Sequence, residues 1–433
     1  MPYEDLEALL AGLAAKHQVP GAQLVVRTAE GVVAVETGER ASGSGDVVTA
    51  STAFPIGSIT KAFTAALVMV LVGDGDIELD APLAETLPWL DSTITARQVL
   101  SHTSGLAANS DLAGPHDGPR ARWVGRHCRA ADLAHRPGTV FSYSGDGYVL
   151  LGHLVEEVTG MSWWEALDAI LLRPLGITAG SIVEDGPRAR DVASGHTVQS
   201  RLGRVLPVVG GTLPSMSAPE GALALSASDL VTFARMHLGD PELPRPLASD
   251  ALATMRQDQT GHTSVGPYGM ADGWGLGWGL YRRDGVEWFG HDGTIDGTSS
   301  HLRCAPGDGT VVALTTNASS GAALWDDLAE HLSVGSRSLS KLDDEGPPVP
   351  APPDCAGRYV NGALEFTIDH RDDGLYLLIG GEPQSKVTTF GGLTFTLHDL
   401  NGGAPQVGRF LRSTVDGRVD LIQCLGRLAT RVP

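Results

Sequence analysis

The sequence is poor in cysteine and in basic residues. Its four cysteines, Cys128, Cys304, Cys355 and Cys424, lie far apart and form no CxxC or CxxH pair. The sequence therefore predicts neither a disulfide framework nor a zinc site. Lys and Arg number 31 against 51 Asp and Glu, a formal charge of −20. Because nucleic-acid affinity depends largely on clustered Lys and Arg, this balance argues against a nucleic-acid partner.

The sequence also lacks a signal peptide and a long uninterrupted apolar run. Residues 1–5 have neither the basic start nor the apolar segment of a signal peptide. The longest apolar stretch, residues 62–72, is interrupted by Thr64, and we expect it to be too short to span a bilayer. Together with reduced thiols, these absences predict a cytoplasmic protein with no membrane partner.

The pattern of apolar residues predicts an α+β fold. Helical periodicity predicts helices over residues 6–13, 59–72, 147–159, 163–172 and near 221–238. Apolar runs between Gly-rich turns predict strands over residues 23–27, 32–36, 286–289, 298–303 and 311–315. Strands from both ends of this region are expected to share one antiparallel sheet, flanked by helices and interrupted by a helical lobe.

The composition changes sharply near Asp343, where charged residues give way to a proline-rich stretch. Residues 341–353 are therefore expected to form an extended linker after a catalytic domain of residues 1–340. Residues 354–433 consist of short alternating runs separated by Gly, Asp and Asn turns, which predict a small all-β barrel or sandwich. No catalytic constellation is evident in this second domain.

Ser58 and Lys61 form the first candidate catalytic group. Ser58 stands where the apolar helix begins, and Lys61 follows one turn later on the same face. A lysine near a serine hydroxyl can accept its proton, and the start of a helix offers N–H groups to an oxyanion. The alternative is a helix cap followed by an exposed lysine, because S-x-x-K also occurs by chance.

Tyr143 and His291 belong to two further elements. Tyr143 lies in a short polar loop before a helix, where its hydroxyl can pass a proton to a leaving group. The alternative for Tyr143 is a half-buried packing role. In the predicted strand, Gly293 permits close approach of a substrate and the N–H of Thr294 can serve as a second oxyanion donor. His291 can bond Tyr143 or a substrate carboxylate, or be a structural histidine.

These elements, in this order, resemble the serine penicillin-recognising family, which includes class C β-lactamases, D-alanyl-D-alanine carboxypeptidases, D-amino-acid peptidases and related esterases. The resemblance covers roughly residues 5–335. It implies an acyl-enzyme mechanism without a metal or cofactor, with Ser58, Lys61, Tyr143 and His291 as catalytic residues. The N–H groups of Ser58 and Thr294 are then expected to form the oxyanion hole. Framing segments match at residues 99–106, 173–176, 194–196 and 275–278.

The sequence departs from the family pattern at two positions. The second motif normally reads Tyr-x-Asn, but here Gly145 occupies the third position and Asp146 follows it. The family's Asn helps to hold the lysine and to bind the substrate, so Gly145 and Asp146 are candidate substrate contacts; Asp146 is otherwise expected to face solvent. The third motif reads His-Asp-Gly instead of Lys-Thr-Gly, which disfavours a true β-lactamase and makes Asp292 and Gly293 candidate substrate contacts.

The pairing of this catalytic domain with a proline-linked, lipocalin-like barrel resembles the stand-alone penicillin-binding-protein-type thioesterases. These enzymes release nonribosomal peptides from a carrier protein by head-to-tail cyclisation. The resemblance implies that Ser58 takes a peptidyl group, usually at a D-residue, from a thioester. The alternatives are a cytoplasmic D-stereospecific peptidase or esterase of the same family and a non-catalytic binding protein that keeps the fold.

Overall fold

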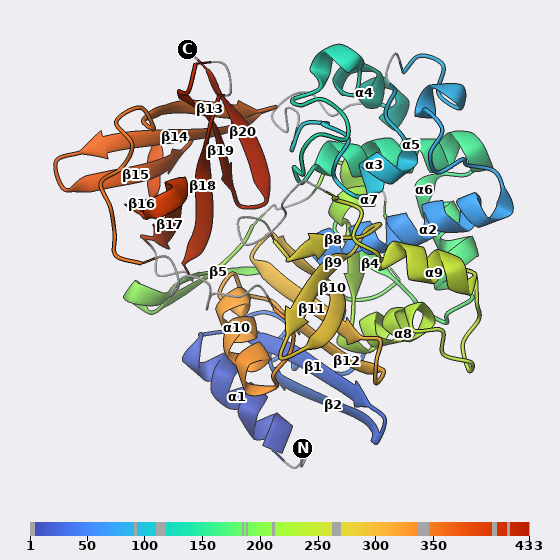
Figure 1. Ribbon diagram of the computed structural model, residues 1–433. Helices are drawn as coiled ribbons and strands as arrows, with labels where there is room; N and C mark the ends of the chain where they lie inside the picture. Colours follow the sequence, from blue (N-terminus) through green and yellow to red (C-terminus); the bar gives the residue numbers. More distant parts are fainter. Residues whose placement is uncertain are drawn as a thin grey trace. The chain divides into compact units, whose positions relative to one another are not determined.

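The chain folds as two compact units, each assembled from separated stretches of sequence (Figure 1). The computed structural model describes residues 5–90, 93–109, 118–183, 186–187, 189–209, 213–261, 270–336, 346–400, 405–413 and 416–432. The first unit comprises Met1–Leu79, Tyr148–Gln257 and Gly275–Ser336. The second comprises Asp80–Gly147, Asp258–Trp274 and Arg337–Pro433. Residues 341–345 of the predicted linker lie outside the described residues.

An antiparallel sheet forms the centre of the first unit, with its strands in the order β2-β1-β12-β11-β10-β9. Leu24 lies opposite Leu314, so the expected pairing of strands from the two ends of the region is confirmed. The strands are β1 (Gly21–Thr28), β2 (Gly31–Gly38), β9 (Gly279–Arg283), β10 (Val286–Ile295), β11 (Thr298–Ala305) and β12 (Thr310–Thr316). The short strand β8 (Gly273–Trp274) belongs to the second unit.

Helices cover this sheet. Every residue of β11 is buried, which requires that both faces of the sheet be covered in its middle. α1 (Leu6–Lys16) and α10 (Gly321–His331) pack against each other and against the sheet, and α8 (Ala227–His237) packs on β1 and β12 (Figure 1). Ser226 and Asp229 form the capping box of α8, as the polar cluster before this helix predicts.

α2 (Thr60–Asp74) is the buried helix that the sequence predicts. Of its 15 residues, those from Thr60 to Leu71 are all buried, and it ends at Gly75 in the left-handed conformation that favours glycine. With the preceding turn, Gly57–Asp74 is long and apolar enough to cross a membrane, so our expectation that this run is too short was wrong. Since 78% of it is buried inside the protein, it has the surroundings of a core helix.

Shorter elements complete the first unit. The helix expected over residues 163–172 is α6 (Trp163–Leu167) continued by a π-helical turn at Asp168–Leu172. The other helices are α7 (Ala218–Gly221) and α9 (Ser249–Met255). Small sheets are formed by β3 (Phe54–Pro55), β7 (Leu223–Leu225) and β4 (Gly180–Ser181), and by β5 (His196–Gln199) and β6 (Arg204–Pro207).

The second unit joins a helical lobe to a closed eight-stranded barrel. The lobe contains α3 (Ala96–Leu100), α4 (Arg120–His127) and the start of α5 (Gly145–Thr159). The barrel confirms the all-β prediction. Its strands are β13 (Gly357–Asn361), β14 (Leu364–Arg371), β15 (Gly374–Ile379), β16 (Glu382–Thr389), β17 (Thr394–Asp399), β18 (Gln406–Arg412), β19 (Val419–Cys424) and β20 (Arg427–Val432).

The inward-facing residues of these strands fill the barrel. Tyr359, Phe366, Phe395 and Phe410 lie in one buried cluster, with none more than 1% exposed. The hydroxyl of Tyr359 donates to the carbonyl oxygen of Cys355 at 2.6 Å, which satisfies its only polar group inside the barrel. The barrel therefore has a hydrophobic core of its own and leaves its loops to make outside contacts.

Candidate active site

Ser58 and Lys61 meet at the beginning of the buried helix. A 3-10 turn, Gly57–Ile59, runs directly into α2, so that the serine precedes the helix and the lysine lies in its first turn. Lys61 Nζ lies 3.3 Å from Ser58 Oγ. Lys61 is only 2% exposed, whereas Ser58 is half-buried. The alternative of an exposed lysine beyond a helix cap is therefore wrong.

Glu220 supplies a contact to the lysine that the sequence did not predict. Its carbonyl oxygen accepts a hydrogen bond from Lys61 Nζ at 2.8 Å, and its carboxylate oxygen Oε2 lies 3.6 Å from the same nitrogen. Thr64 Oγ1 fixes α7 against α2 by donating to the carbonyl oxygen of Pro219 at 2.7 Å. No motif marks Glu220, because its role depends on a contact with Lys61, 159 residues away.

Strand β10 and the turn that carries Ser58 approach each other closely at two glycines, one on each segment. A Cβ at Gly293 would lie 1.8 Å from the carbonyl oxygen of Ile56 and 3.0 Å from the amide nitrogen of Ser58. Gly57 has φ +50°, and its Cβ would lie 3.0 Å from the amide nitrogen of Thr294. Only glycine permits these approaches. The amide groups of Ser58 and Thr294, expected as oxyanion donors, therefore flank the same narrow contact.

His291 lies buried on the same strand. It is 1% exposed, and its Nδ1 is 2.7 Å from the carbonyl oxygen of Asp292. Burial lowers the pKa of His291 to about 4, and the hydrogen bond to Asp292 only partly opposes this change. The imidazole is therefore neutral near pH 7 and can donate a hydrogen bond from one ring nitrogen and accept one at the other.

Asp292 makes structural contacts with the side chains of Arg303 and His301. Its two carboxylate oxygens accept hydrogen bonds from Arg303 at 2.8 and 2.9 Å, and His301 Nδ1 lies 2.7 Å from one of them. Burial favours the protonated acid, but Arg303 and His301 outweigh it and hold the pKa of Asp292 well below its usual range. The carboxylate therefore fixes β10 against β11, and the substrate contact expected of Asp292 stays a prediction.

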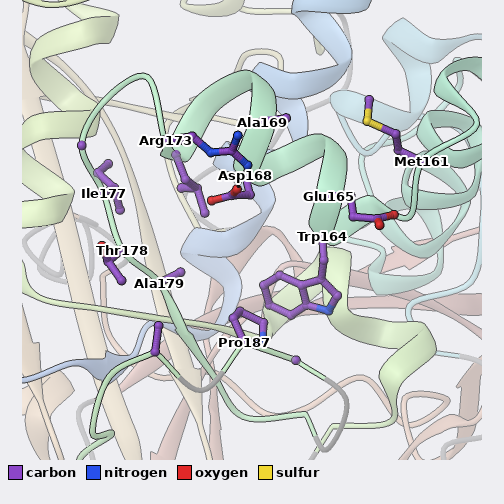
Figure 2. A pocket seen from close by; sticks show the side chains of 14 residues that line it. Met161, Trp164, Glu165, Asp168, Ala169, Arg173, Ile177, Thr178, Ala179 and Pro187 are labelled. Atoms are coloured by element: carbon purple, nitrogen blue, oxygen red, sulfur yellow. Dashed lines mark hydrogen bonds and ion pairs between the residues drawn. The ribbon is translucent and has the colours of Figure 1, made fainter.

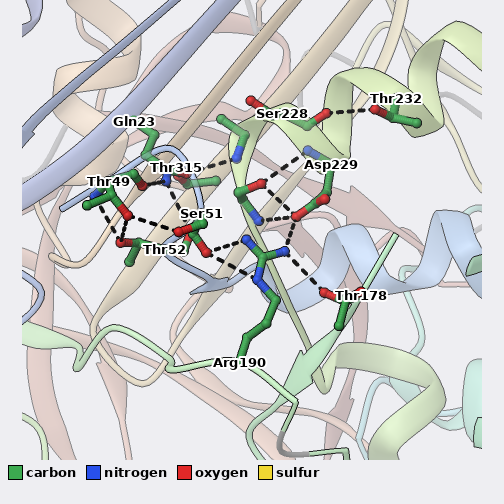
Figure 3. A network of polar contacts seen from close by, with 12 residues as sticks. Gln23, Thr49, Ser51, Thr52, Thr178, Arg190, Ser228, Asp229, Thr232 and Thr315 are labelled. Carbon is green, nitrogen blue, oxygen red and sulfur yellow. Dashed lines mark hydrogen bonds and ion pairs between the residues drawn. The ribbon is translucent and has the colours of Figure 1, made fainter. Parts of the chain in front are cut away.

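A second polar network supports the segment that leads into the nucleophile (Figure 3). Arg190 donates to the carbonyl oxygens of Ser51 and Thr178 and pairs with Asp229. Gln23, which lies on strand β1, donates to the carbonyl oxygen of Thr49 at 2.6 Å. The segment before Ser58 is thus tied to the central sheet and to the cap of α8, which restrains where the helix begins.

The second unit presents Tyr143 in a buried loop. Tyr143 is 3% exposed, and its ring lies 4.2 Å, centroid to centroid, from that of His102. His102 Nδ1 accepts the N–H of Ser144 at 3.1 Å, and His102 has φ +57°. In the sequence, the segment around His102 was only a framing match to the family. In the structure, His102 packs against the ring of Tyr143 and accepts a hydrogen bond from the loop that carries it.

Gly145 and Asp146 follow in the same loop and helix. The N–H of Gly145 donates to the carbonyl oxygen of Ala108 at 2.7 Å. Asp146 is only 3% exposed, so our expectation that it faces solvent was wrong. Its charge contributes to the raised pKa of the buried Cys128 thiol, second to burial itself. The carboxylate therefore lies inside the second unit near Cys128.

The first unit also contains a cavity of about 740 Å³ that lacks the candidate catalytic side chains (Figure 2). Asp168 and Arg173 form an ion pair on its wall. It is lined by Met161, Trp164, Glu165, Asp168, Ala169, Leu172, Arg173, Gly176, Ile177, Thr178, Ala179, Gly186, Pro187 and Ala189. Since neither Ser58 nor Lys61 lines this cavity, we do not assign the reaction to it.

Metal ligation has no candidate site in the described part of the chain. Within it, no group of three or more His, Cys, Asp or Glu side chains is arranged to hold a metal ion. The four cysteines are free and buried. Burial raises the pKa of Cys424 to about 12 and that of Cys355 to about 11, so both stay as unreactive thiols.

Comparisons with known proteins agree with this geometry. The Beta-lactamase family model matches residues 6–333. Penicillin-binding protein 4 of Amycolatopsis lactamdurans is 38% identical over 332 residues, which are 74% of this chain and 86% of that protein. SurE, also solved with D-Leu, is 36% identical, with a TM-score of 0.82 and 98% of both chains covered. A D-stereospecific amidohydrolase from Streptomyces sp. is 26% identical (TM-score 0.58), covering 72% of this chain and 94% of that one.

Proposed function

Because the chain belongs to the β-lactamase and penicillin-binding-protein family of serine hydrolases, we propose that it is a peptidyl transferase that closes peptides into rings. Ser58 takes a peptidyl group, ending in a D-residue, from a thioester or ester. The amine at the other end of the same peptide then attacks the seryl ester. The product is a head-to-tail macrocycle, and the serine is regenerated.

The contact between Lys61 Nζ and Ser58 Oγ carries the proposal. Lys61 accepts the hydroxyl proton as Oγ attacks the carbonyl carbon, and the N–H groups of Ser58 and Thr294 stabilise the oxyanion. Collapse of the tetrahedral adduct breaks the bond to the thiol, which leaves with a proton that Tyr143 donates. Attack by the peptide amine reverses these steps. Tyr143 takes a proton from the amine, and Lys61 returns a proton to Ser58 Oγ as the ester bond breaks.

Cyclisation is supported by the pairing of this catalytic domain with a closed β-barrel, which resembles the stand-alone penicillin-binding-protein-type thioesterases. The similarity to SurE extends over 98% of both chains and so includes both parts. SurE has been solved with D-Leu, which supports a D-residue at the acyl position here. A carrier protein bearing the peptidyl thioester is the partner that we propose. Such a partner places the protein in the cytoplasm, where these thioesters are assembled.

The test is mass spectrometry of products after purified protein is mixed with a short peptidyl thioester mimic that ends in a D-residue. We expect a product lighter than the free acid by one water, and no such product from the matched L-ended peptide. Ser58→Ala serves as the inactive control. Free acid alone from the D-ended peptide would contradict cyclisation.

A D-stereospecific peptidase or esterase is the second candidate. It is favoured by the similarity to the D-stereospecific amidohydrolase from Streptomyces sp.. The two candidates share the acyl-enzyme and differ only in whether water or an amine removes the acyl group. A non-catalytic protein with this fold is the third. Labelling of Ser58 by a fluorophosphonate would contradict that third candidate.

Gly145 offers a test of substrate size. The amide side chain that the family carries at this position is missing here, and we propose that its absence admits bulky acyl groups. Gly145→Asn is expected to lower kcat/KM for large D-acyl thioesters several-fold more than for small ones. The measurement is kcat/KM over a series of acyl chains. An unchanged profile would mean that Gly145 has no part in substrate choice.

A further inference from the structure

The barrel contacts the tyrosine loop through the side chain of Asn361, at the end of β13. Asn361 is 1% exposed. Its Oδ1 accepts the N–H of Ala108 at 2.7 Å. Its Nδ2 donates to Ser142 Oγ at 3.0 Å and to the carbonyl oxygen of Leu428 at 2.8 Å. One amide group therefore uses its acceptor and one donor to join the barrel to two segments of the helical lobe, while its other donor bonds β20 inside the barrel.

The turn between β19 and β20 makes the second contact. The carbonyl oxygen of Gly426 accepts the backbone N–H of Tyr143 at 2.9 Å, and the N–H of Leu428 donates to Ser142 Oγ at 3.2 Å. Gly426 has φ +74°, and a Cβ there would lie 2.7 Å from Met270 Cγ. The close approach therefore requires glycine at this turn.

A third contact fixes the neighbouring segment of the lobe. Ala363 donates its N–H to the carbonyl oxygen of Asn109 at 3.0 Å, next to a bridge between Asn109 and Gly362. His135 Nε2 lies 2.8 Å from the carbonyl oxygen of Leu428. The barrel thus contacts several segments of the lobe that lie around the tyrosine.

These contacts matter because the tyrosine loop has no sheet or helix of its own to satisfy its backbone. Ser142 and Tyr143 are buried, and a buried N–H without a partner is costly. The barrel supplies the acceptor for the N–H of Tyr143 and two donors to Ser142 Oγ. In the described part of the chain, the backbone position of Tyr143 therefore depends on residues more than 200 positions away.

We propose that Asn361 is a positioning residue and that the barrel is the scaffold that sets Tyr143 for proton transfer. The inference rests on the proposed function, in which Tyr143 protonates the leaving group. A proton donor acts only within hydrogen-bond reach of the group that it serves, and small displacements lower the rate steeply. Asn361 touches neither substrate nor reacting atom in this scheme and acts through the loop.

The proposal makes the effect of Asn361 depend on the leaving group. A p-nitrophenolate leaves as a stable anion and needs no proton, whereas an ethoxide must be protonated as it departs. The probes are therefore the p-nitrophenyl and ethyl esters of one N-acyl D-amino acid, compared by kcat/KM, which reports the acylation steps. A general structural defect would lower both rates in the same proportion.

Four variants complete the experiment. Asn361→Ala removes the whole side-chain contact, and Ser142→Ala removes only the hydroxyl at its far end. Tyr143→Phe gives the full effect of losing the proton donor. Tyr359→Phe is the matched control, because it removes one buried hydrogen bond from the same strand, inside the barrel. Thermal unfolding of each variant measures the stability lost.

We expect Asn361→Ala to lower kcat/KM for the ethyl ester about tenfold. Tyr143→Phe, which removes the proton donor itself, should lower it about 10²-fold or more. The p-nitrophenyl ester should change by less than about twofold in both. Ser142→Ala should follow the same pattern more weakly, and Tyr359→Phe should lower only the unfolding temperature.

Two results separate the inference from the proposed function. If Tyr143→Phe is selective for the ethyl ester but Asn361→Ala and Ser142→Ala are not, the barrel does not position the tyrosine. Equal loss on both esters in Asn361→Ala would overturn the inference in the same way. If Tyr143→Phe itself is not selective, or if the wild type cleaves neither ester, the proposed function fails and the inference with it.

Discussion

The nucleophile and the tyrosine are positioned in different ways. Ser58 and Lys61 lie three residues apart where α2 begins, and a single helical turn brings their side chains together. Tyr143 has no such local frame, and its loop is bonded to Asn361 and Gly426 of the barrel. A catalytic group on a helix can be recognised from spacing, whereas a group on a loop depends on distant parts of the chain.

The largest effect expected on the nucleophile side is that of Ser58→Ala. Turnover should fall by about 10⁶-fold, as for the loss of a serine nucleophile elsewhere. The free energy of unfolding should change by less than about 0.5 kcal/mol, because Ser58 is half-buried and contributes one hydroxyl. Steady-state kinetics and chemical denaturation measure the two quantities. Appreciable remaining turnover would mean that another residue is the nucleophile.

The ion pair between Asp292 of β10 and Arg303 of β11 tests whether the structure around the nucleophile also depends on tertiary contacts. Asp292→Asn would leave the fully buried Arg303 without its counter-charge, which should cost about 3 to 5 kcal/mol of folding stability. Chemical denaturation measures the loss. The control is Glu365→Gln, which breaks an exposed pair with Arg358 in the barrel and should change little. Equal losses would show that the network around Asp292 is not structural.

A pH dependence is expected from His237 in the first unit. Burial lowers its pKa to about 3, and nearby Arg256 adds to the effect. The folded state therefore keeps His237 neutral while the unfolded state takes up a proton below about pH 6.5. Stability should be lost as the pH falls from 6.5 toward 3, by about 2 kcal/mol at pH 5.

The control for this pH dependence is His237→Leu, which removes the titrating ring. Thermal unfolding of wild type and variant between pH 7 and 5 should show a smaller decrease for the variant. His291, with a pKa of about 4, should account for part of the decrease that remains. Parallel curves for the two proteins would contradict the assignment to His237.

The smallest expected effect is that of Glu220→Gln, which adds a distant contact to the nucleophile side. The substitution keeps the carbonyl oxygen bonded to Lys61 and removes the carboxylate charge 3.6 Å away. We expect turnover to fall about tenfold, equivalent to about 1.4 kcal/mol. Glu157→Gln, on the surface of α5, is the control. An unchanged rate would show that the carboxylate charge of Glu220 plays no part in the function of Lys61.

Much of the first unit was predictable because its elements carry clear periodicity. The runs that became α2, α8 and β10 to β12 are apolar and bounded by Gly or by capping residues. In the barrel, three strands cannot be recognised from their composition. β13 and β20 carry arginines, and β16 reads Glu-Pro-Gln-Ser-Lys-Val-Thr-Thr, so that only alternate residues face the core. Their pairing with neighbouring strands, not their composition, makes them strands.

The candidate active site, like the fold, was only partly predictable from the sequence. The spacing of Ser58 and Lys61 was sufficient to expect their contact. Gly293 was expected to admit a substrate, and the structure shows that the backbone of Ile56 and Ser58 approaches it closely. Asp146 was expected on the surface but is buried, because a charged residue gives no sign of its surroundings in the sequence. Asp292 lies on the expected catalytic strand, and its carboxylate accepts hydrogen bonds from Arg303.

The sequence by itself determined the family, the α+β class, the nucleophile with its lysine, and the presence of a separate all-β region. These follow from local patterns, since helical spacing and strand alternation act over a few residues. Only the tertiary structure decided that Glu220 contacts Lys61 and that Asn361 of the barrel bonds the loop of Tyr143. A hydrogen bond between residues 219 positions apart leaves no pattern in a single sequence, because its geometry exists only after folding.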